Sequence, residues 1–229
     1  MSWADRAARA RLLADRYPAS SELLRFYAEL ALWQQQAAPR ASAPEAAAAL
    51  FPELVALLER CAPRPLAETA RVTDGDRIAA IVGEAIEGRD LAVSDDFFAR
   101  ALLQPWAAER SAGACPWCAS APVAGALLPA GEGLRLDLVC ALCFGRRPFP
   151  RGRCAGCGAE GEALASYAAA DFAHLALVAC ERCKRCLTTV DLARDAGAIP
   201  EVDELAGLAL AVWAHDRGYT KLRRNIAGI

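Results

Sequence analysis

The sequence predicts an α+β protein with an all-helical N-terminal part, two tandem four-cysteine modules and a C-terminal helix. Three observations support this prediction. Apolar residues recur at helical spacing through about the first 110 residues. Short alternating strands and turns follow them. Four C-x-x-C pairs lie in that second part, and each pair can present two sulfurs to one ion from a single tight turn.

Changes in composition divide the chain into four ranges. We expect a helical domain over 1–112, a first four-cysteine module over 113–149, a second over 150–195, and a C-terminal helix and tail over 196–229. The last helix follows Pro200, because proline suits the first helical position and acidic residues come next. Each module is a repeat of roughly 40 residues and is too small to bury a core unaided.

Proline residues mark where the N-terminal helices are predicted to end. The first amphipathic helix stops at Pro18, since proline lacks the N–H that a helix interior needs. A later helix ends at Cys61, and Pro63 and Pro65 enforce the stop. Another helix is expected over Asp76–Glu87, where isoleucine and valine share one face.

Serine residues mark where several helices are predicted to begin. Ser20 or Ser21 can cap the second helix. Ser42 and Glu45 have the spacing of a capping box before the leucine-rich helix that ends at residue 61. Ser94 precedes two aspartates, which favour the positive end of a helix dipole, and the aromatic stripe that follows is expected to pack in the core.

The second part of the chain shows two hairpins built on one plan. The first would pair Pro122–Leu128 with Leu134–Val139, where leucines alternate with other residues. The second would pair Ala163–Tyr167 with His174–Ala179, and a strand over Cys186–Leu192 can complete it. Each hairpin brings the chain from one C-x-x-C pair to the next.

The cysteine pairs are separated by 21, 10 and 22 residues, which gives a long, a short and a long gap. Two pairs across a long gap are the usual form of a tetrahedral four-cysteine site. The predicted ligands are Cys115, Cys118, Cys140 and Cys143 in site one, and Cys154, Cys157, Cys180 and Cys183 in site two. A rival grouping joins the two middle pairs, but Pro148 and Pro150 make a hairpin between them less plausible.

Four thiolates suit zinc or a single iron, and the spacing does not separate these two ions. The Cys115-Pro116-Trp117-Cys118 turn is similar to the knuckles of rubredoxins and of zinc ribbons, so both modules are predicted to be rubredoxin-like or zinc-ribbon-like. The residue after the second cysteine of a knuckle often needs a positive φ, which favours glycine. Gly158 meets this expectation, whereas Ala119, Phe144 and Lys184 stand at the equivalent positions.

Two cysteines fall outside the pairs. Cys186 extends the last pair to C-x-x-C-x-x-C, but the run lacks the further cysteine and proline of a ferredoxin cluster motif, so a spare thiol is expected. Cys61 lies in a helical region and is interpreted as a small buried apolar residue.

A catalytic zinc needs an open coordination position, and four sulfurs close both predicted sites. The sequence contains no glycine-rich phosphate loop or nucleophile elbow, and its two histidines, His174 and His215, are expected to be structural. We therefore predict that the protein is not an enzyme. The net charge of −2 gives no global reason to expect nucleic acid or an anionic membrane as a partner. With no apolar run near ~18 residues and no signal-like N-terminus, the protein is expected to be cytoplasmic, without membrane insertion.

The basic run from Arg146 to Arg153, with Arg182, Lys184 and Arg185, is the strongest signal for nucleic acid. Its cations could follow phosphates, and Phe149 could stack on a base. A solvated linker or a patch that meets an acidic protein surface is the preferred interpretation, so nucleic acid is an unlikely partner.

The chain resembles the FdhE family, which comprises accessory proteins of formate dehydrogenase biogenesis. The resemblance rests on the four C-x-x-C pairs with their gaps and on further segments: Cys115-Pro116-x-Cys118 followed by Pro122, Gly133-Leu134-Arg135 before Cys140, Gly218-Tyr219, Asn225, and the run from Phe97 to Pro105. It covers residues 94–229 well and the N-terminal helices in general character.

The resemblance implies a helical domain followed by two rubredoxin-like modules, each with one mononuclear metal ion. Iron is the ion it implies, and zinc remains possible. It also implies a cytoplasmic protein that acts on the catalytic subunit of formate dehydrogenase during maturation. Two other functions stay open: a zinc-ribbon adaptor for nucleic acid or transcription machinery, and a rubredoxin-like electron carrier.

Overall fold

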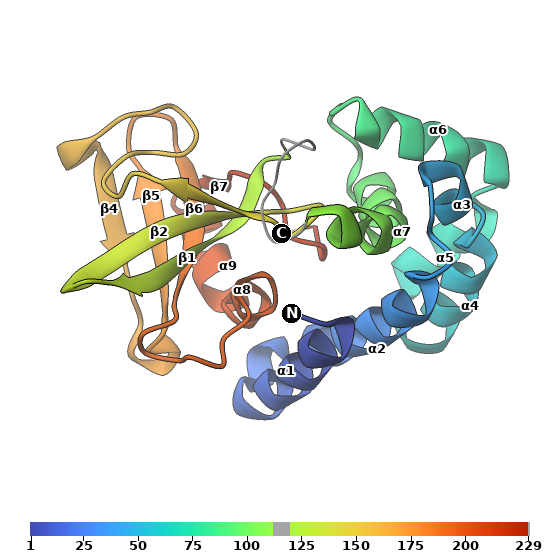
Figure 1. Ribbon diagram of the computed structural model, residues 1–229, viewed down its shortest axis with the longest axis horizontal. Helices are drawn as coiled ribbons and strands as arrows, with labels where there is room; N and C mark the ends of the chain where they lie inside the picture. Colours follow the sequence, from blue (N-terminus) through green and yellow to red (C-terminus); the bar gives the residue numbers. More distant parts are fainter. Residues whose placement is uncertain (112–119, 229) are drawn as a thin grey trace.

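The computed structural model describes residues 1–111 and 120–228. Helices and one mixed sheet form its two parts, and α8 (Pro200–Ala206) lies between them (Figure 1). This helix contacts α1 and α2 on one side and strands β1 and β6 on the other. The α+β prediction, with helices first and the cysteine-bearing sheet second, is confirmed.

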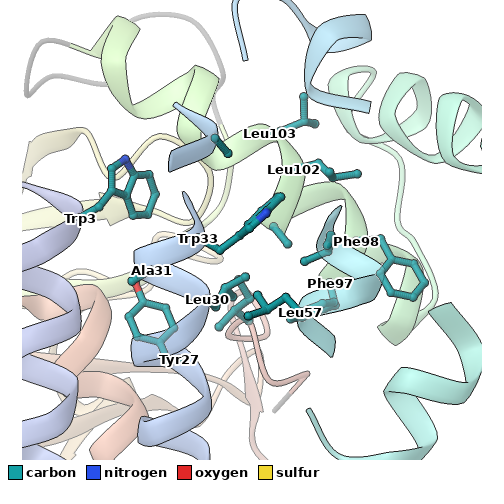
Figure 2. Packing of buried hydrophobic residues seen from close by; sticks show 14 of the residues in the cluster. Trp3, Tyr27, Leu30, Ala31, Trp33, Leu57, Phe97, Phe98, Leu102 and Leu103 are labelled. Atoms are coloured by element: carbon teal, nitrogen blue, oxygen red, sulfur yellow. The ribbon is translucent and has the colours of Figure 1, made fainter. Parts of the chain in front are cut away.

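Seven helices make up the N-terminal part. They are α1 (Trp3–Arg16), α2 (Ser21–Ala37), α3 (Pro44–Ala48), α4 (Phe51–Cys61), α5 (Arg64–Val72), α6 (Gly75–Ile86) and α7 (Val93–Ser111). Their apolar faces meet in one core, where Phe98 stacks edge-on against both Phe51 and Phe97 (Figure 2). The aromatic stripe of α7 therefore packs in the core, as expected.

Helix starts differ from the serine signals in three places. Ser20 precedes α2, but its hydroxyl donates to the Ala206 carbonyl of α8. Ala43, not Ser42, is the N-cap of α3. Ser94 lies within the first turn of α7, which begins one residue earlier. Ser20 stands at the predicted N-cap position but makes no side-chain cap hydrogen bond, and the predictions for Ser42 and Ser94 were wrong. Tertiary contacts and prolines at helix starts determine these boundaries.

Proline begins helices here as well as ending them. Pro52 stands in the first turn of α4 and separates it from α3, so the leucine-rich helix is two helices. Pro65 stands in the first turn of α5, a helix that we had not predicted because both prolines after Cys61 suggested only a stop. Proline suits this place because the first helical N–H groups have no intrahelical partner.

The sheet has the strand order β3-β2-β1-β6-β5-β4, and β7 pairs with β6. The strands are β1 (Pro122–Ala130), β2 (Gly133–Cys140), β3 (Arg146–Phe149), β4 (Leu164–Tyr167), β5 (Leu175–Cys180), β6 (Arg185–Asp191) and β7 (Thr220–Lys221). Both predicted hairpins are present, β1 with β2 and β4 with β5. A parallel pairing of β1 with β6 joins the two hairpins, so the strands of both predicted modules form one sheet. The four domain ranges stay a prediction.

Strand β3 falls in the basic run that we interpreted as a linker. It pairs antiparallel with β2 although it contains Pro148. Proline is tolerated there because β3 is an edge strand, where one side of the backbone makes no ladder hydrogen bonds.

The C-terminal helix predicted after Pro200 is also divided. It turns at Gly207 into α8 and α9 (Leu208–Asp216). A Cβ at Gly207 would lie 3.4 Å from Leu175 Cδ1 and 3.3 Å from the Glu204 carbonyl, so the corner packs closely on the sheet. In residues 1–111 and 120–228, no helix combines the length and the apolar character needed to cross a bilayer.

Candidate metal centre

The second predicted site lies where two turns of the sheet meet. Cys154 and Cys157 belong to the turn that follows β3, and Cys180 and Cys183 to the turn between β5 and β6. The four Sγ atoms all lie within 4.8 Å of one another. Cys154 Sγ is 3.6 Å from Cys183 Sγ, and Cys157 Sγ is 3.7 Å from Cys180 Sγ.

These distances match a tetrahedral site. With Zn–S bonds of about 2.3 Å, the edges of a regular tetrahedron of sulfurs are roughly 3.8 Å. Cys154 and Cys180 are buried, Cys183 is half-buried, and Cys157 is exposed at the surface. The sulfurs are thus already spaced to hold one ion near the surface.

Backbone geometry around the second site is that of two knuckles. The Gly156 N–H points at Cys154 Sγ at 3.3 Å, which would stabilise a thiolate. Each knuckle closes with a hydrogen bond from the residue after its second cysteine to the carbonyl of its first: Gly158 N to Cys154 O at 2.9 Å, and Lys184 N to Cys180 O at 2.8 Å.

Closing a knuckle in this way requires a left-handed residue after the second cysteine. Gly158 has φ 73°, Lys184 has φ 55° and Phe144, at the equivalent place in the first site, has φ 56°. Within the described ranges, these last two are the non-glycine residues with positive φ. The expectation of positive φ at this position is therefore met even where the residue is not glycine.

Gly158 provides a direct test of that geometry. Gly158→Ala is expected to lower the free energy of unfolding by about 1–2 kcal/mol, since a Cβ disfavours the left-handed region. Gly83→Ala is the matched control: nothing lies within 4 Å of a Cβ there. In the interior of α6 it is expected to raise stability by about 0.5–1 kcal/mol. Urea unfolding of both variants measures the difference, and equal shifts of the same sign would contradict the knuckle geometry.

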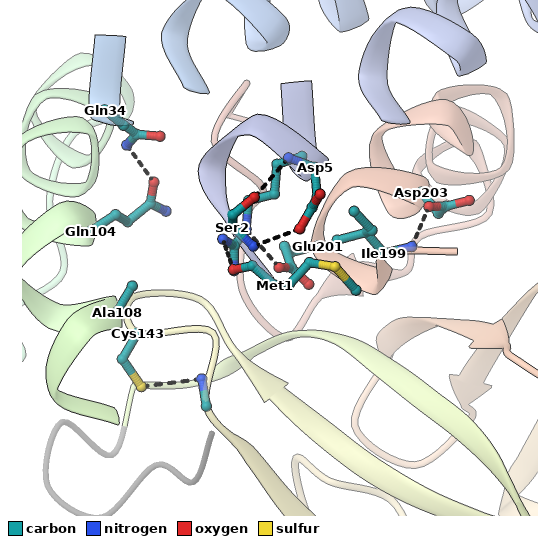
Figure 3. A network of polar contacts seen from close by, with 12 residues as sticks. Met1, Ser2, Asp5, Gln34, Gln104, Ala108, Cys143, Ile199, Glu201 and Asp203 are labelled. Atoms are coloured by element: carbon teal, nitrogen blue, oxygen red, sulfur yellow. Dashed lines mark hydrogen bonds and ion pairs between the residues drawn. The ribbon is translucent and has the colours of Figure 1, made fainter. Parts of the chain in front are cut away.

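The first predicted site is described in part. Cys140 ends β2 and Cys143 lies in the turn before β3, and both side chains are buried. The Leu142 N–H lies 3.5 Å from Cys140 Sγ. The Gly145 N–H lies 3.4 Å from Cys143 Sγ (Figure 3). Cys115, Cys118 and Ala119 lie outside the described residues. The knuckle formed by the two described cysteines matches those of the second site.

Aromatic contacts tie this first knuckle to the N-terminal helix. The Phe144 ring meets the Trp3 ring edge-on with centroids 5.9 Å apart. The Arg6 guanidinium stacks 4.6 Å from the centroid of Phe144 and donates to Glu201 of α8 at 2.8 Å. The turn that carries Cys143 is thus packed against α1 and α8.

The thiols of the second site hold their protons unequally. Burial raises the pKa of Cys180, but hydrogen bonds from backbone N–H groups and from neighbouring cysteines outweigh it and bring the pKa to about 7. Burial and the adjacent sulfurs raise the pKa of Cys183 to about 12. One thiolate therefore forms readily, and further negative charge is resisted. A bound cation would relieve that repulsion, so the donor set fits a metal ion.

His174, Asp195 and Asp203 form a second group with ligand atoms within 4.8 Å of one another. The Arg9 guanidinium already lies among them: its Nη2 is 2.6 Å from Asp195 Oδ2, and its Nε is 2.9 Å from Asp203 Oδ2. Because this cation balances the carboxylates, we assign the group to a structural ion-pair network. The sequence analysis missed it, since Asp203 was interpreted through the helix dipole and no local pattern links it to Arg9.

The remaining cysteines stand apart from the four-sulfur cluster. Cys186 is buried in β6 and packs against Ala214 and Tyr219, and burial raises the pKa of its thiol. The Cys61 thiol donates to the Leu57 carbonyl at 3.3 Å. Both positions agree with the interpretation of these residues as non-ligands.

The chain was compared with protein families, curated proteins and solved structures. No protein-family model matches the chain. The protein FdhE homolog of Aquifex aeolicus (strain VF5) is 28% identical over 117 residues, which span 50% of this chain and 41% of that relative. The chain therefore matches less than half the length of this curated relative.

The crystal structure of the FdhE protein from Pseudomonas aeruginosa has the same fold. Its TM-score is 0.72 at 24% identity, and the superposition covers 98% of this chain and 94% of that one. The chain is thus similar to an FdhE homolog in sequence over about half of its length, and to an FdhE protein in fold over nearly all of it.

Proposed function

We propose that this protein is a cytoplasmic, non-catalytic accessory factor in the maturation of formate dehydrogenase. In this role it binds the catalytic subunit through a sheet held rigid by metal ions. The observation that carries the proposal is the cluster of four Sγ atoms within 4.8 Å, in a chain that is similar to FdhE proteins in sequence and in fold.

We propose one mononuclear ion at Cys154, Cys157, Cys180 and Cys183, and a second at Cys140 and Cys143 together with Cys115 and Cys118. Iron is the ion that the family resemblance favours, and zinc has the same ligand preference. Four sulfurs leave no open coordination position, so the ions hold the two turns of each site together rather than bind a substrate.

Contacts around the sites support a structural role for the ions. The cysteine turns connect the strands that form the middle and the edges of the sheet, and the Cys143 turn packs on α1 and α8. An ion in each site would fix the relative position of these strands. A partner could then dock on a surface that does not have to be ordered during binding, which lowers the entropic cost of association.

Deletion of the gene tests the proposed function. The deletion strain is expected to make the formate dehydrogenase polypeptide at normal level but to lose most of its formate dehydrogenase activity, and a plasmid copy should restore it. Immunoblotting and an activity assay on the same extracts separate loss of enzyme from loss of activity. Full activity in the deletion strain would contradict the proposal.

A further inference from the structure

One face of the sheet carries apolar side chains that no helix of residues 1–111 and 120–228 covers. Register places Leu127 on β1 opposite Leu136 on β2, and Val178 on β5 opposite Leu187 on β6, all on this face. The opposite face packs on α8 and α9 through the residues that alternate with them. Leu127, Leu136 and Val178 are half-buried, and Leu187 is buried. A solvated face of a sheet normally carries polar residues, so these apolar side chains need an explanation.

A pocket of about 280 Å³ lies over this face. Phe149 on β3 and Leu164 on β4 both line it, so the two edge strands of the sheet form opposite walls of the pocket. In the described part of the chain, each of these strands pairs with one neighbour, which leaves its outer backbone edge available to an extended segment.

The charged residues at the pocket are all cationic. Arg151, Arg153 and Arg185 line it, and the described lining includes no aspartate or glutamate. Arg153 pairs with Glu160 at 2.7 Å. Arg151 donates to the Leu134 carbonyl at 3.1 Å and Arg185 to the Lys221 carbonyl at 3.2 Å, and neither forms an ion pair within residues 1–111 and 120–228. The guanidinium groups of Arg151 and Arg185 therefore lie beside an apolar pocket and can form ion pairs with an anionic ligand.

We propose that this pocket binds an extended acidic segment of a partner protein. One apolar side chain of the segment enters the pocket and packs on Leu136 and Leu187, and carboxylates pair with Arg151 and Arg185. The volume lies below the roughly 300–1,000 Å³ of pockets for whole small ligands, so it suits a single anchoring side chain better. The proposal rests on the proposed function, since the segment belongs to the protein that is bound during maturation.

Calorimetric titration with a synthetic peptide tests the pocket. The probe is acetylated and amidated, with one central phenylalanine flanked on each side by two glutamates; in the matched peptide, glutamine replaces every glutamate. The glutamate peptide is expected to bind, more weakly as salt increases. Binding should weaken about tenfold in the R151A/R185A variant, on the scale of one or two exposed charge pairs. No binding, or equal binding of the glutamine peptide, would overturn the proposal.

Two further variants separate the pocket from general effects. Ala176→Phe fills the pocket from β5 and is expected to abolish binding, while R25A/R64A removes two exposed arginines of the helical part and should leave it unchanged. Metal content and far-ultraviolet circular dichroism of each variant confirm that the sheet is intact. Octanoate serves as a small carboxylate probe, and tighter binding of octanoate than of the peptide would overturn the assignment to a protein segment.

The same variants distinguish the two proposals in cells. If the deletion strain lacks formate dehydrogenase activity, A176F and R151A/R185A are expected to restore it poorly and R25A/R64A fully. Full restoration by the pocket variants would overturn the pocket proposal and leave the proposed function intact. Activity in the deletion strain itself would contradict the proposed function, and the titration would then decide the pocket by itself.

Discussion

Cys180→Ser is expected to lose the metal ion of the second site and to unfold the sheet at a much lower temperature than the unsubstituted protein. The free energy of structural zinc sites in small peptides is about 10–16 kcal/mol. The free energy of unfolding of a whole domain is typically about 5–15 kcal/mol. The binding free energy of the ion is therefore comparable to the total stability of the fold. Elemental analysis of protein purified without added metal, together with thermal unfolding, measures both effects.

Cys61→Ser is the matched control for this substitution. Cys61 also has a partly buried thiol, but it lies on α4, outside the sheet, and donates to the Leu57 carbonyl. This variant is expected to keep its metal content and nearly all of its stability, because serine can donate the same hydrogen bond. Retention of a full metal complement by Cys180→Ser would contradict the assignment of the second site.

Arg9→Met is expected to lower the free energy of unfolding by about 3–5 kcal/mol, because it removes one partner of a buried ion pair. Asp203 is fully buried, and it accepts hydrogen bonds from Arg9 and from the Ile199 N–H at 2.8 Å (Figure 3). It also lies 2.7 Å from His174 Nε2. Without the guanidinium, the charge of Asp203 would be left in the interface between α1, α8 and the sheet. Urea unfolding of the purified variant measures the loss.

Arg11→Met is the control, because Arg11 lies on the same helix and pairs with Glu29 at 3.0 Å with both side chains about half exposed. Exposed pairs contribute about 0–1 kcal/mol, so the control should remain close to the unsubstituted protein. Similar losses in the two variants would mean that the buried network does not stabilise the junction between helices and sheet.

The Arg9 network also gives stability a dependence on pH. Burial raises the pKa of Asp195, but hydrogen bonds and the charge of Arg9 lower it by a larger amount. The net shift of the pKa is therefore downward from 3.8. A carboxyl with a lowered pKa in the folded state stabilises the protein above its unfolded pKa, and the effect is lost as pH falls through the folded pKa. Arg9→Met should therefore lose stability less steeply than the unsubstituted protein below about pH 4.

Local patterns predicted the elements that depend on local chemistry. Alternation in Leu134–Val139 gave the hairpin strand β2, and the C-x-x-C spacing led to the expectation that Cys154 and Cys180 lie together, as they do in the structure. Both signals depend on residues a few positions apart, where side-chain direction or turn geometry is fixed by the backbone.

Features that depend on distant contacts were not predictable in the same way. The parallel pairing of β1 with β6 joins residues more than sixty positions apart, and no residue of either strand signals it. Ser20 is a residue type that favours the N-cap and stands at that position, yet its hydroxyl donates to the Ala206 carbonyl of α8 instead of capping the helix. Strand β3 lies in the basic run that was interpreted as a solvated linker or a surface patch, and its proline is allowed at the edge of the sheet.

The most direct test of the account is formate dehydrogenase activity in the deletion strain that carries either the unsubstituted gene, Cys61→Ser or Cys180→Ser. The account predicts full activity with the first two and little activity with Cys180→Ser, because the sheet that we propose as the docking surface for the enzyme subunit would depend on its ion. Equal activity with all three genes would contradict the claim that a metal-held sheet performs the accessory function.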